Sequence, residues 1–168
     1  SSFSTAENAG NAGFVEITGD NITLDDNALF ELASFGGGVG GEMRVIGSTI
    51  NVDGVQIEAE AKGSGIGGDV EFTADLLNLS NTSIDASVRG DGVGGLIRLT
   101  GGDIDLADTI INITALGSGT AGDFVATGKS FTMTGSATSY GIFGDTRGDG
   151  SGADVLLSTD TVSLDGVA

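Results

Sequence analysis

Residues 68–90 read GDVEFTADLLNLSNTSIDASVRG, and the apolar residues of this stretch fall into three groups. Within each group, apolar side chains alternate with polar ones: Val70 and Phe72, then Leu77 and Leu79, then Ile84, Ala86 and Val88. Strict alternation over a few residues is typical of a strand with one buried face. The stretch therefore predicts three short strands separated by polar or glycine-containing turns, with no room for a helical crossover.

The same pattern recurs along the whole chain. When a small residue is taken as the start of each unit, the second, fourth, ninth and eleventh residues after it are apolar in every unit. The starting residues are Gly13, Gly41, Gly68, Gly95, Gly122 and Ala153, which lie 28, 27, 27, 27 and 31 residues apart. A fixed period of this length indicates that each unit buries its core only against its neighbours.

Units of this kind could form antiparallel hairpins, propeller blades or coils of a parallel β-helix. Blades need about 40 to 50 residues and four strands. Hairpins predict Asn-Gly turns between neighbouring strands, and the sequence has no Asn-Gly pair. We therefore predict one all-β domain over residues 1–168, a right-handed parallel β-helix (β-solenoid) of about six coils of 27–31 residues, with three short strands per coil. Handedness follows by analogy with other parallel crossovers, and stacking at about 4.8 Å per coil gives a rod about 29 Å long.

The outward position three residues into each unit is consistent with in-register stacking. Its first four members alternate in charge from coil to coil: Glu16, Arg44, Glu71 and Arg98. Opposite charges that face each other across neighbouring strands contribute about 0.2 to 1 kcal/mol per pair. We therefore predict that these residues form an inter-coil charge ladder.

The charge balance excludes several classes of partner. The chain has 24 acidic and 6 basic residues and a formal net charge of −18. Binding to nucleic acid or to an anionic membrane surface depends on Lys and Arg, so we expect neither partner. No apolar run approaches the roughly 18 residues that cross a bilayer, so we expect no membrane insertion. Residues 1–20 lack the basic start and apolar stretch of a signal peptide, which predicts a mature chain or part of a longer one.

Glycines gather at one edge of the predicted coil, within residues 36–41, 63–68, 90–95, 117–122 and 148–152. We expect sharp turns there, with glycines that adopt positive φ. The fifth unit is the longest, which predicts a loop or bulge near Tyr140, Ile142 and Phe143.

The two ends of the chain have complementary patterns. Residues 153–168 supply the first two strands of a coil, whereas residues 1–8, with Phe3 facing inward, resemble a third strand. We therefore predict half-coils at 1–8 and 153–168 and no cap at either end. Open ladder ends can pair with further strands. This predicts an end-to-end interface formed by Phe3, Val155, Leu157, Val162 and Leu164, either between copies in a head-to-tail fibre or within a longer solenoid.

The tripeptide Arg-Gly-Asp occurs twice, at residues 89–91 and 147–149, both within glycine-rich corners. An exposed basic and acidic tripeptide on a turn could engage a receptor. Gly and Asp are also the residues that such a turn requires, so turn chemistry is the competing interpretation.

Acidic residues suggest two further kinds of site, a calcium site and a catalytic site. Stacked carboxylates, Glu42 with Asp69 and Asp123 with Asp154, could share a surface calcium ion, because hard cations prefer oxygen ligands. Acid pairs such as Asp103 and Asp105 could perform glycosidase chemistry, but that needs two carboxyls across a cleft. No long loop builds a cleft, and the chain has neither His nor Cys. We therefore expect no enzymatic activity and no resident cofactor.

Residues 10–18 (GNAGFVEIT) and 67–74 (GGDVEFTA), each followed by further alternating strands, resemble the repeats of filamentous-haemagglutinin-type adhesins. The closest likeness is to large cyanobacterial surface proteins of this family, and it covers essentially the whole chain. The resemblance implies a right-handed parallel β-helix shaft, export by two-partner secretion, and roles in adhesion or biofilm. No binding residue of the family maps onto this sequence.

The leading hypothesis is an extracellular or cell-surface structural rod that works by mechanical reach, adhesion and head-to-tail self-assembly. Its partners would be further copies of itself and a cell-surface or matrix polysaccharide. The alternative is a carbohydrate- or calcium-binding β-helix surface module, which a groove lined by aromatic and acidic residues would favour.

Overall fold

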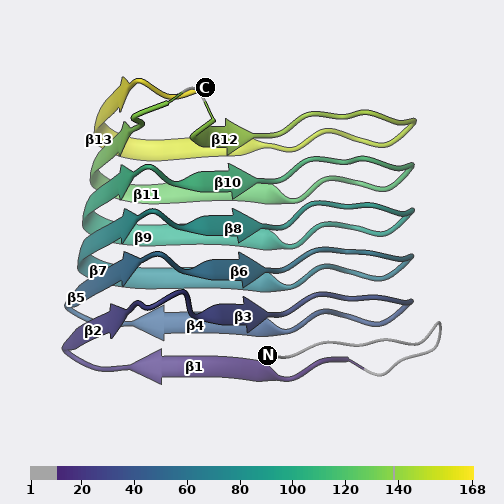
Figure 1. The fold of residues 1–168 in the computed structure, drawn as a ribbon, viewed down its shortest axis with the longest axis horizontal. Coiled ribbons are helices and arrows are strands. Elements are labelled where there is room, and N and C mark those ends of the chain that lie inside the picture. The colour runs from purple at the N-terminus through teal and green to yellow at the C-terminus, as the bar shows by residue number, and fades with distance from the viewer. Residues whose placement is uncertain (1–10, 138) are drawn as a thin grey trace.

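A computed structural model describes residues 11–137 and 139–168. Over these residues the chain is an all-β solenoid of about six turns, with parallel strands and no helix. In Figure 1 the turns lie one above the other, from the purple β1 to the yellow β13. The predicted fold class, a parallel β-solenoid, is confirmed.

The strands form two sheets. The larger sheet contains the first two faces of each coil: β1 (Phe14–Thr18), β2 (Asn21–Leu24), β4 (Glu42–Ile46), β5 (Thr49–Asp53), β7 (Asp69–Ser80), β9 (Leu96–Ala107), β11 (Asp123–Thr134) and β13 (Val155–Asp165). The smaller sheet contains the third face: β3 (Leu29–Glu31), β6 (Gln56–Glu58), β8 (Ser83–Asp85), β10 (Ile110–Asn112) and β12 (Gly141–Phe143). Each strand pairs with the equivalent strand of the next coil.

The first two faces of a coil are separate strands only in the first two coils. From the third coil onward they join into one strand of 11 or 12 residues, namely β7, β9, β11 and β13. Where β9 and β11 bend, Gly102 and Lys129 leave the pairing while the residues on both sides keep it. Because only one residue per coil is skipped, the ladder of hydrogen bonds continues around the bend.

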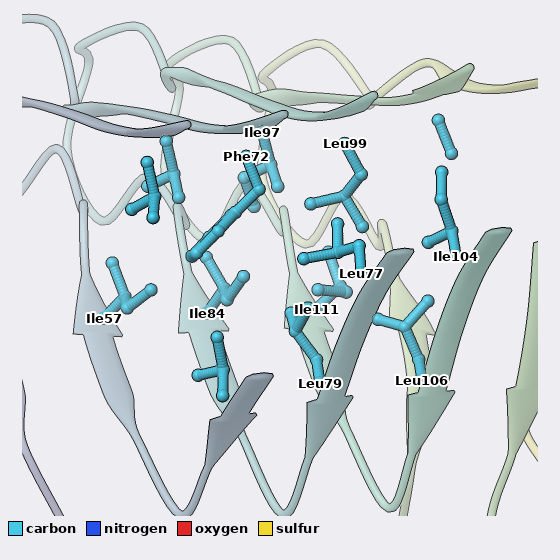
Figure 2. Close-up of a cluster of buried hydrophobic side chains, with 14 of the residues drawn as sticks. Ile57, Phe72, Leu77, Leu79, Ile84, Ile97, Leu99, Ile104, Leu106 and Ile111 are labelled. Carbon is cyan, nitrogen blue, oxygen red and sulfur yellow. The ribbon is translucent and has the colours of Figure 1, made fainter. Parts of the chain in front are cut away.

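The core lies between the two sheets, in columns set by the strand register. Met43 lies opposite Val70, and Val70 lies opposite Ile97, as the repeat period predicts. All three side chains are fully buried. Figure 2 shows Phe72, Leu77 and other side chains of this core extending into the interior that the stacked coils share. Each coil therefore completes the core of the coil beside it.

The glycine-rich segments form the tips of the coils, at the right of Figure 1. Among the described residues, the glycines with positive φ are Gly54, Gly141 and Gly166, and none of them lies in a tip. The expectation of positive φ at these glycines is therefore wrong.

Close stacking of the tips explains the glycines instead. Gly92 N donates to Gly63 O at 3.1 Å, and Gly65 N donates to Gly36 O at 2.8 Å. A Cβ added to Gly65 would collide with the carbonyl oxygen of Gly38 and would lie 2.6 Å from that of Gly36. At these glycine positions the neighbouring tips approach so closely that a side chain does not fit.

Positive φ occurs instead at the corner that precedes the third face. Gly54 (φ 67°), Asn81 (φ 49°) and Asp108 (φ 48°) directly follow paired positions of successive coils. Gly, Asn and Asp tolerate this left-handed conformation better than other residues. The extra residues of the fifth unit lie at the same corner, between Thr134 at the end of β11 and Gly141 at the start of β12.

The predicted half-coils lie at the two ends of the chain. Phe3 and the half-coil expected at residues 1–8 lie outside the described residues. At the other end, β13 is the last strand of the larger sheet and pairs with β11. The end of β13 and the residues after it contact the longer corner: Gly135 N donates to Asp165 O at 2.9 Å, and Ala168 N donates to Tyr140 O at 2.9 Å.

Candidate functional surfaces

The predicted charge ladder lies on the outer face of the larger sheet. The register places Glu16 opposite Arg44, Arg44 opposite Glu71, and Glu71 opposite Arg98. Arg44 Nε binds Glu71 Oε2 at 2.9 Å, whereas Arg44 Nη2 binds Glu42 Oε1 of its own strand at 2.7 Å. Within residues 11–137 and 139–168, no ion pair joins Arg44 to Glu16 or Glu71 to Arg98.

Arg44 is the centre of this column. The hydrogen bond to Glu71 raises the pKa of Arg44, as do the charges of Glu42, Glu71 and, least, Glu16. The side chains of Glu42, Arg44 and Glu71 are 47%, 43% and 30% exposed, and solvent weakens ion pairs at such positions. The pair of Arg44 and Glu71 can favour the correct register, and Arg44, which also pairs with Glu42, offers little to a ligand.

A second ionic cluster, which the sequence analysis did not identify, lies at the base of the tips. Glu60 is buried, with a side chain only 4% exposed. Its Oε1 accepts a hydrogen bond from Arg89 Nε at 2.6 Å, and its Oε2 pairs with Lys62 Nζ at 2.8 Å. Lys62 Nζ also lies 4.5 Å from the centre of the Phe35 ring. This Glu60 cluster connects three successive coils.

The electrostatics of the Glu60 cluster hold both cations in the charged form. Burial of Lys62 lowers its pKa, but the hydrogen bonds and charges of Glu60 and Glu58 outweigh this effect, so the pKa is raised overall. The hydrogen bond to Glu60 raises the pKa of Arg89. Because Glu60 is paired with two cations, its burial does not leave an uncompensated charge.

The Glu60 cluster also bears on the Arg-Gly-Asp tripeptides. Arg89 of the first tripeptide forms an ion pair with the buried Glu60. This contact favours the interpretation that the first tripeptide serves the turn and does not bind a receptor. Arg147 of the second tripeptide lies 3.3 Å from Asp145, with side chains 70% and 64% exposed. The two tripeptides therefore occupy different environments despite their identical sequences.

The stacked carboxylates proposed for calcium already have other contacts. Asp69 Oδ1 accepts a hydrogen bond from Leu96 N at 2.7 Å, and Asp123 Oδ1 accepts one from Asp154 N at 3.1 Å. Glu42 forms an ion pair with Arg44 of the charge ladder. No group of three or more potential metal ligands occurs in the described part of the chain. The geometry therefore gives no support to calcium binding at these pairs.

The acid pair considered for glycosidase chemistry lies on a regular strand. Asp103 and Asp105 belong to β9, and both have their partners on β11 in the register, Ser130 and Thr132. Asp103 Oδ1 accepts a hydrogen bond from Ser130 Oγ at 2.6 Å. The pair therefore sits on one face of a sheet, which is unlike the two carboxyls that face each other across a glycosidic bond.

The last strand presents core positions to solvent. Val155, Val162 and Leu164 are 49%, 48% and 55% exposed, and Leu157 is partly buried against the core. Their partners one coil earlier, Phe124, Phe131, Met133 and Ala126, are at most 1% exposed. We call the four β13 residues the end face. The fifth member of the predicted interface, Phe3, lies outside the described residues.

A groove lies on the outer face of the smaller sheet, between the fourth and fifth coils. The groove has a volume of about 470 Å³ and is open to solvent. The residues that line it from β10 and β12 and the chain just after them are Ile110, Asn112, Thr114, Leu116, Phe143, Asp145 and Arg147. We call this the β10–β12 groove. It combines an aromatic ring, an amide and an exposed ion pair.

Comparison of the chain with models of protein families, with curated proteins and with solved structures gives no match. Among the described residues there is also no helix with the length and apolar character needed to cross a bilayer. The end face and the β10–β12 groove are therefore the two surfaces of this structure that can suggest a function.

Proposed function

We propose that this chain is a structural rod of an extracellular or cell-surface protein, and that it extends when a further coil stacks on the end face. The observation that carries the proposal is the exposure of core positions on β13 whose partners on β11 are buried. Full burial of one Val or Leu side chain stabilises by about 1.5 to 3 kcal/mol. Covering the end face therefore provides a strong drive for stacking.

The backbone of β13 supports the same role. This strand runs over 11 residues, and its described partner strand is β11, on one side only. An open edge of this length can pair with another strand through main-chain hydrogen bonds. A parallel coil placed there would continue both the hydrogen bonds and the apolar columns.

The incoming coil can come from two sources, a second copy of the chain in a fibre or the next coil of a longer shaft. Both need the same contact with the end face. The resemblance to filamentous-haemagglutinin-type adhesins favours a role at the cell surface, where such a rod would provide reach and adhesion. The net charge of −18 disfavours side-by-side clumping of rods, because like charges repel.

The experiment measures self-association of the purified chain at rising concentration, by sedimentation velocity and electron microscopy. We expect the wild-type chain to form rods that lengthen with concentration, more strongly in salt, because salt screens the repulsion between chains. The double variant Val162→Asp, Leu164→Asp places charges on the end face and is expected to remain monomeric.

The matched control is Leu76→Asp, which adds a charge at a partly exposed outer position of β7, away from the end face. It should associate like the wild type. A folded wild-type chain that stays monodisperse at every concentration would contradict the proposal, as would equal association of the end-face variant.

A further inference from the structure

The outer face of the smaller sheet changes character along the rod. One outward column reads Glu31, Glu58, Asp85, Asn112 and Phe143 from the first coil to the fifth. The acidic side chains of the first three coils thus give way to an amide and then to an aromatic ring. The β10–β12 groove lies where this change occurs.

The longer corner adds a wall at the same place. Ser139, which belongs to the extra residues between β11 and β12, lines the groove together with Phe143. At the equivalent corners of the third and fourth coils, β8 and β10 begin only three positions after the preceding strand ends. The added wall and the aromatic ring therefore occur in the same coil.

The polar groups in the groove make contacts within the protein and can still form further hydrogen bonds. Asn112 Nδ2 donates to Asp85 Oδ1 at 3.2 Å, which leaves its second N–H. Arg147 Nη2 pairs with Asp145 Oδ2 at 3.3 Å, and both side chains are mostly exposed. The ion pair is neutral overall, and its exposed groups can donate and accept further hydrogen bonds.

We propose that the β10–β12 groove binds a neutral oligosaccharide. A sugar ring has an apolar face that can pack on the ring of Phe143, and hydroxyls that can bind the amide of Asn112 and the charged groups of Asp145 and Arg147. Ligand sites commonly combine apolar surface with a few well-placed polar groups. The net charge of −18 repels polyanions, which favours an uncharged glycan over an acidic one. This binding activity goes beyond the structural role proposed above.

The test is isothermal titration calorimetry on the monomeric end-face double variant, so that assembly does not contribute heat. The neutral probes are cellohexaose, laminarihexaose and maltohexaose, and the anionic probe is hexagalacturonate. We expect at least one neutral probe to bind at concentrations up to about 10 mM, the range where weak ligands are detected, and hexagalacturonate to bind less tightly.

Phe143→Leu keeps an apolar side chain but removes the ring, and it should weaken binding by about tenfold. Arg147→Gln should also weaken it. The matched control is Phe35→Leu, which removes an aromatic ring near the first tip, outside the groove, and should bind like the parent. Thermal unfolding of each variant checks that the fold is retained.

Three results would overturn the proposal: no binding of any neutral probe, preference for hexagalacturonate, or equal affinity of Phe143→Leu and Phe35→Leu. None of these results bears on rod assembly, which is measured separately with the chain whose end face is intact. The two proposals can therefore fail independently.

Discussion

Glycines at two kinds of corner in this solenoid are required for different physical reasons. At the tips, Gly65 and Gly119 lack positive φ, but an added Cβ would collide with a carbonyl oxygen of the preceding tip. At the corner before the third face, Gly54 has a φ of 67°, and nothing lies within 4 Å of an added Cβ. A run of glycines in a solenoid can therefore indicate crowding by the neighbouring coil, whereas an isolated Gly, Asn or Asp can indicate a left-handed backbone.

Gly65→Ala tests the crowded corner and should have the largest effect. The new methyl group would overlap backbone atoms of the preceding tip, which cannot move away as a flexible side chain can. We expect a loss of about 3 kcal/mol in the free energy of unfolding, measured by urea denaturation. A loss below that of Gly54→Ala would contradict the crowding explanation.

Glu60→Gln tests whether ionic contacts help to hold the tips. The variant keeps the shape of the buried side chain but removes the charge that Lys62 and Arg89 contact at 2.8 Å and 2.6 Å. We expect a loss of about 2 kcal/mol, the scale of a hydrogen bond to a charged group. Asp145→Asn is the control, because its partner contact is longer and exposed, and it should change stability little.

Gly54→Ala tests the open corner. Space is available there, so the expected loss comes only from placing a Cβ on a left-handed backbone, about 1 kcal/mol. Gly54→Asn should recover part of this loss, because Asn occupies the next position of the column at Asn81 with φ 49°. Equal denaturation midpoints for the Ala and Asn variants would show that backbone conformation does not determine stability at this corner.

Asp53 provides the smallest test, at the same open corner. Hydrogen bonds from Asn81 Nδ2 and then Ser80 Oγ lower the pKa of Asp53 below its ordinary value of 3.8. The ionised carboxylate therefore adds stability that is complete above pH 3.8 and is lost as the pH falls through the lowered pKa. Asp53→Asn should melt below the wild type at neutral pH, and the difference should shrink in acid. A difference in melting temperature that stays constant from neutral to acid pH would exclude this contribution.

The sequence predicted the architecture because apolar positions repeat with a period that leaves few alternatives. The columns through Val70 and Leu77 follow directly from that period. It did not predict why the tips contain glycine, since crowding between coils is a property of the stacked backbone and not of one unit. It also could not foresee the joining of two faces into β7, which depends on how few residues leave the pairing at the bend.

The surfaces were predicted less completely. The register of Glu16, Arg44 and Glu71 follows from the alternation of charge, but the choice of Glu42 as the second partner of Arg44 is a matter of side-chain reach within one strand. Glu60 escaped notice because its column holds Ala33, Ser87 and Thr114, which show no charge pattern. The groove could have been suspected from the replacement of acids by Asn112 and Phe143, had that column been read together with the longer unit.

The uniform register of the middle coils has a consequence for how the protein can change in length. Met43, Val70, Ile97 and Phe124 succeed one another every 27 residues, at the same position of the register. Loss or duplication of one such block in the tandem DNA would join two coils that already match. The solenoid would then become shorter or longer by one whole coil, and the contact between neighbouring coils would stay the same.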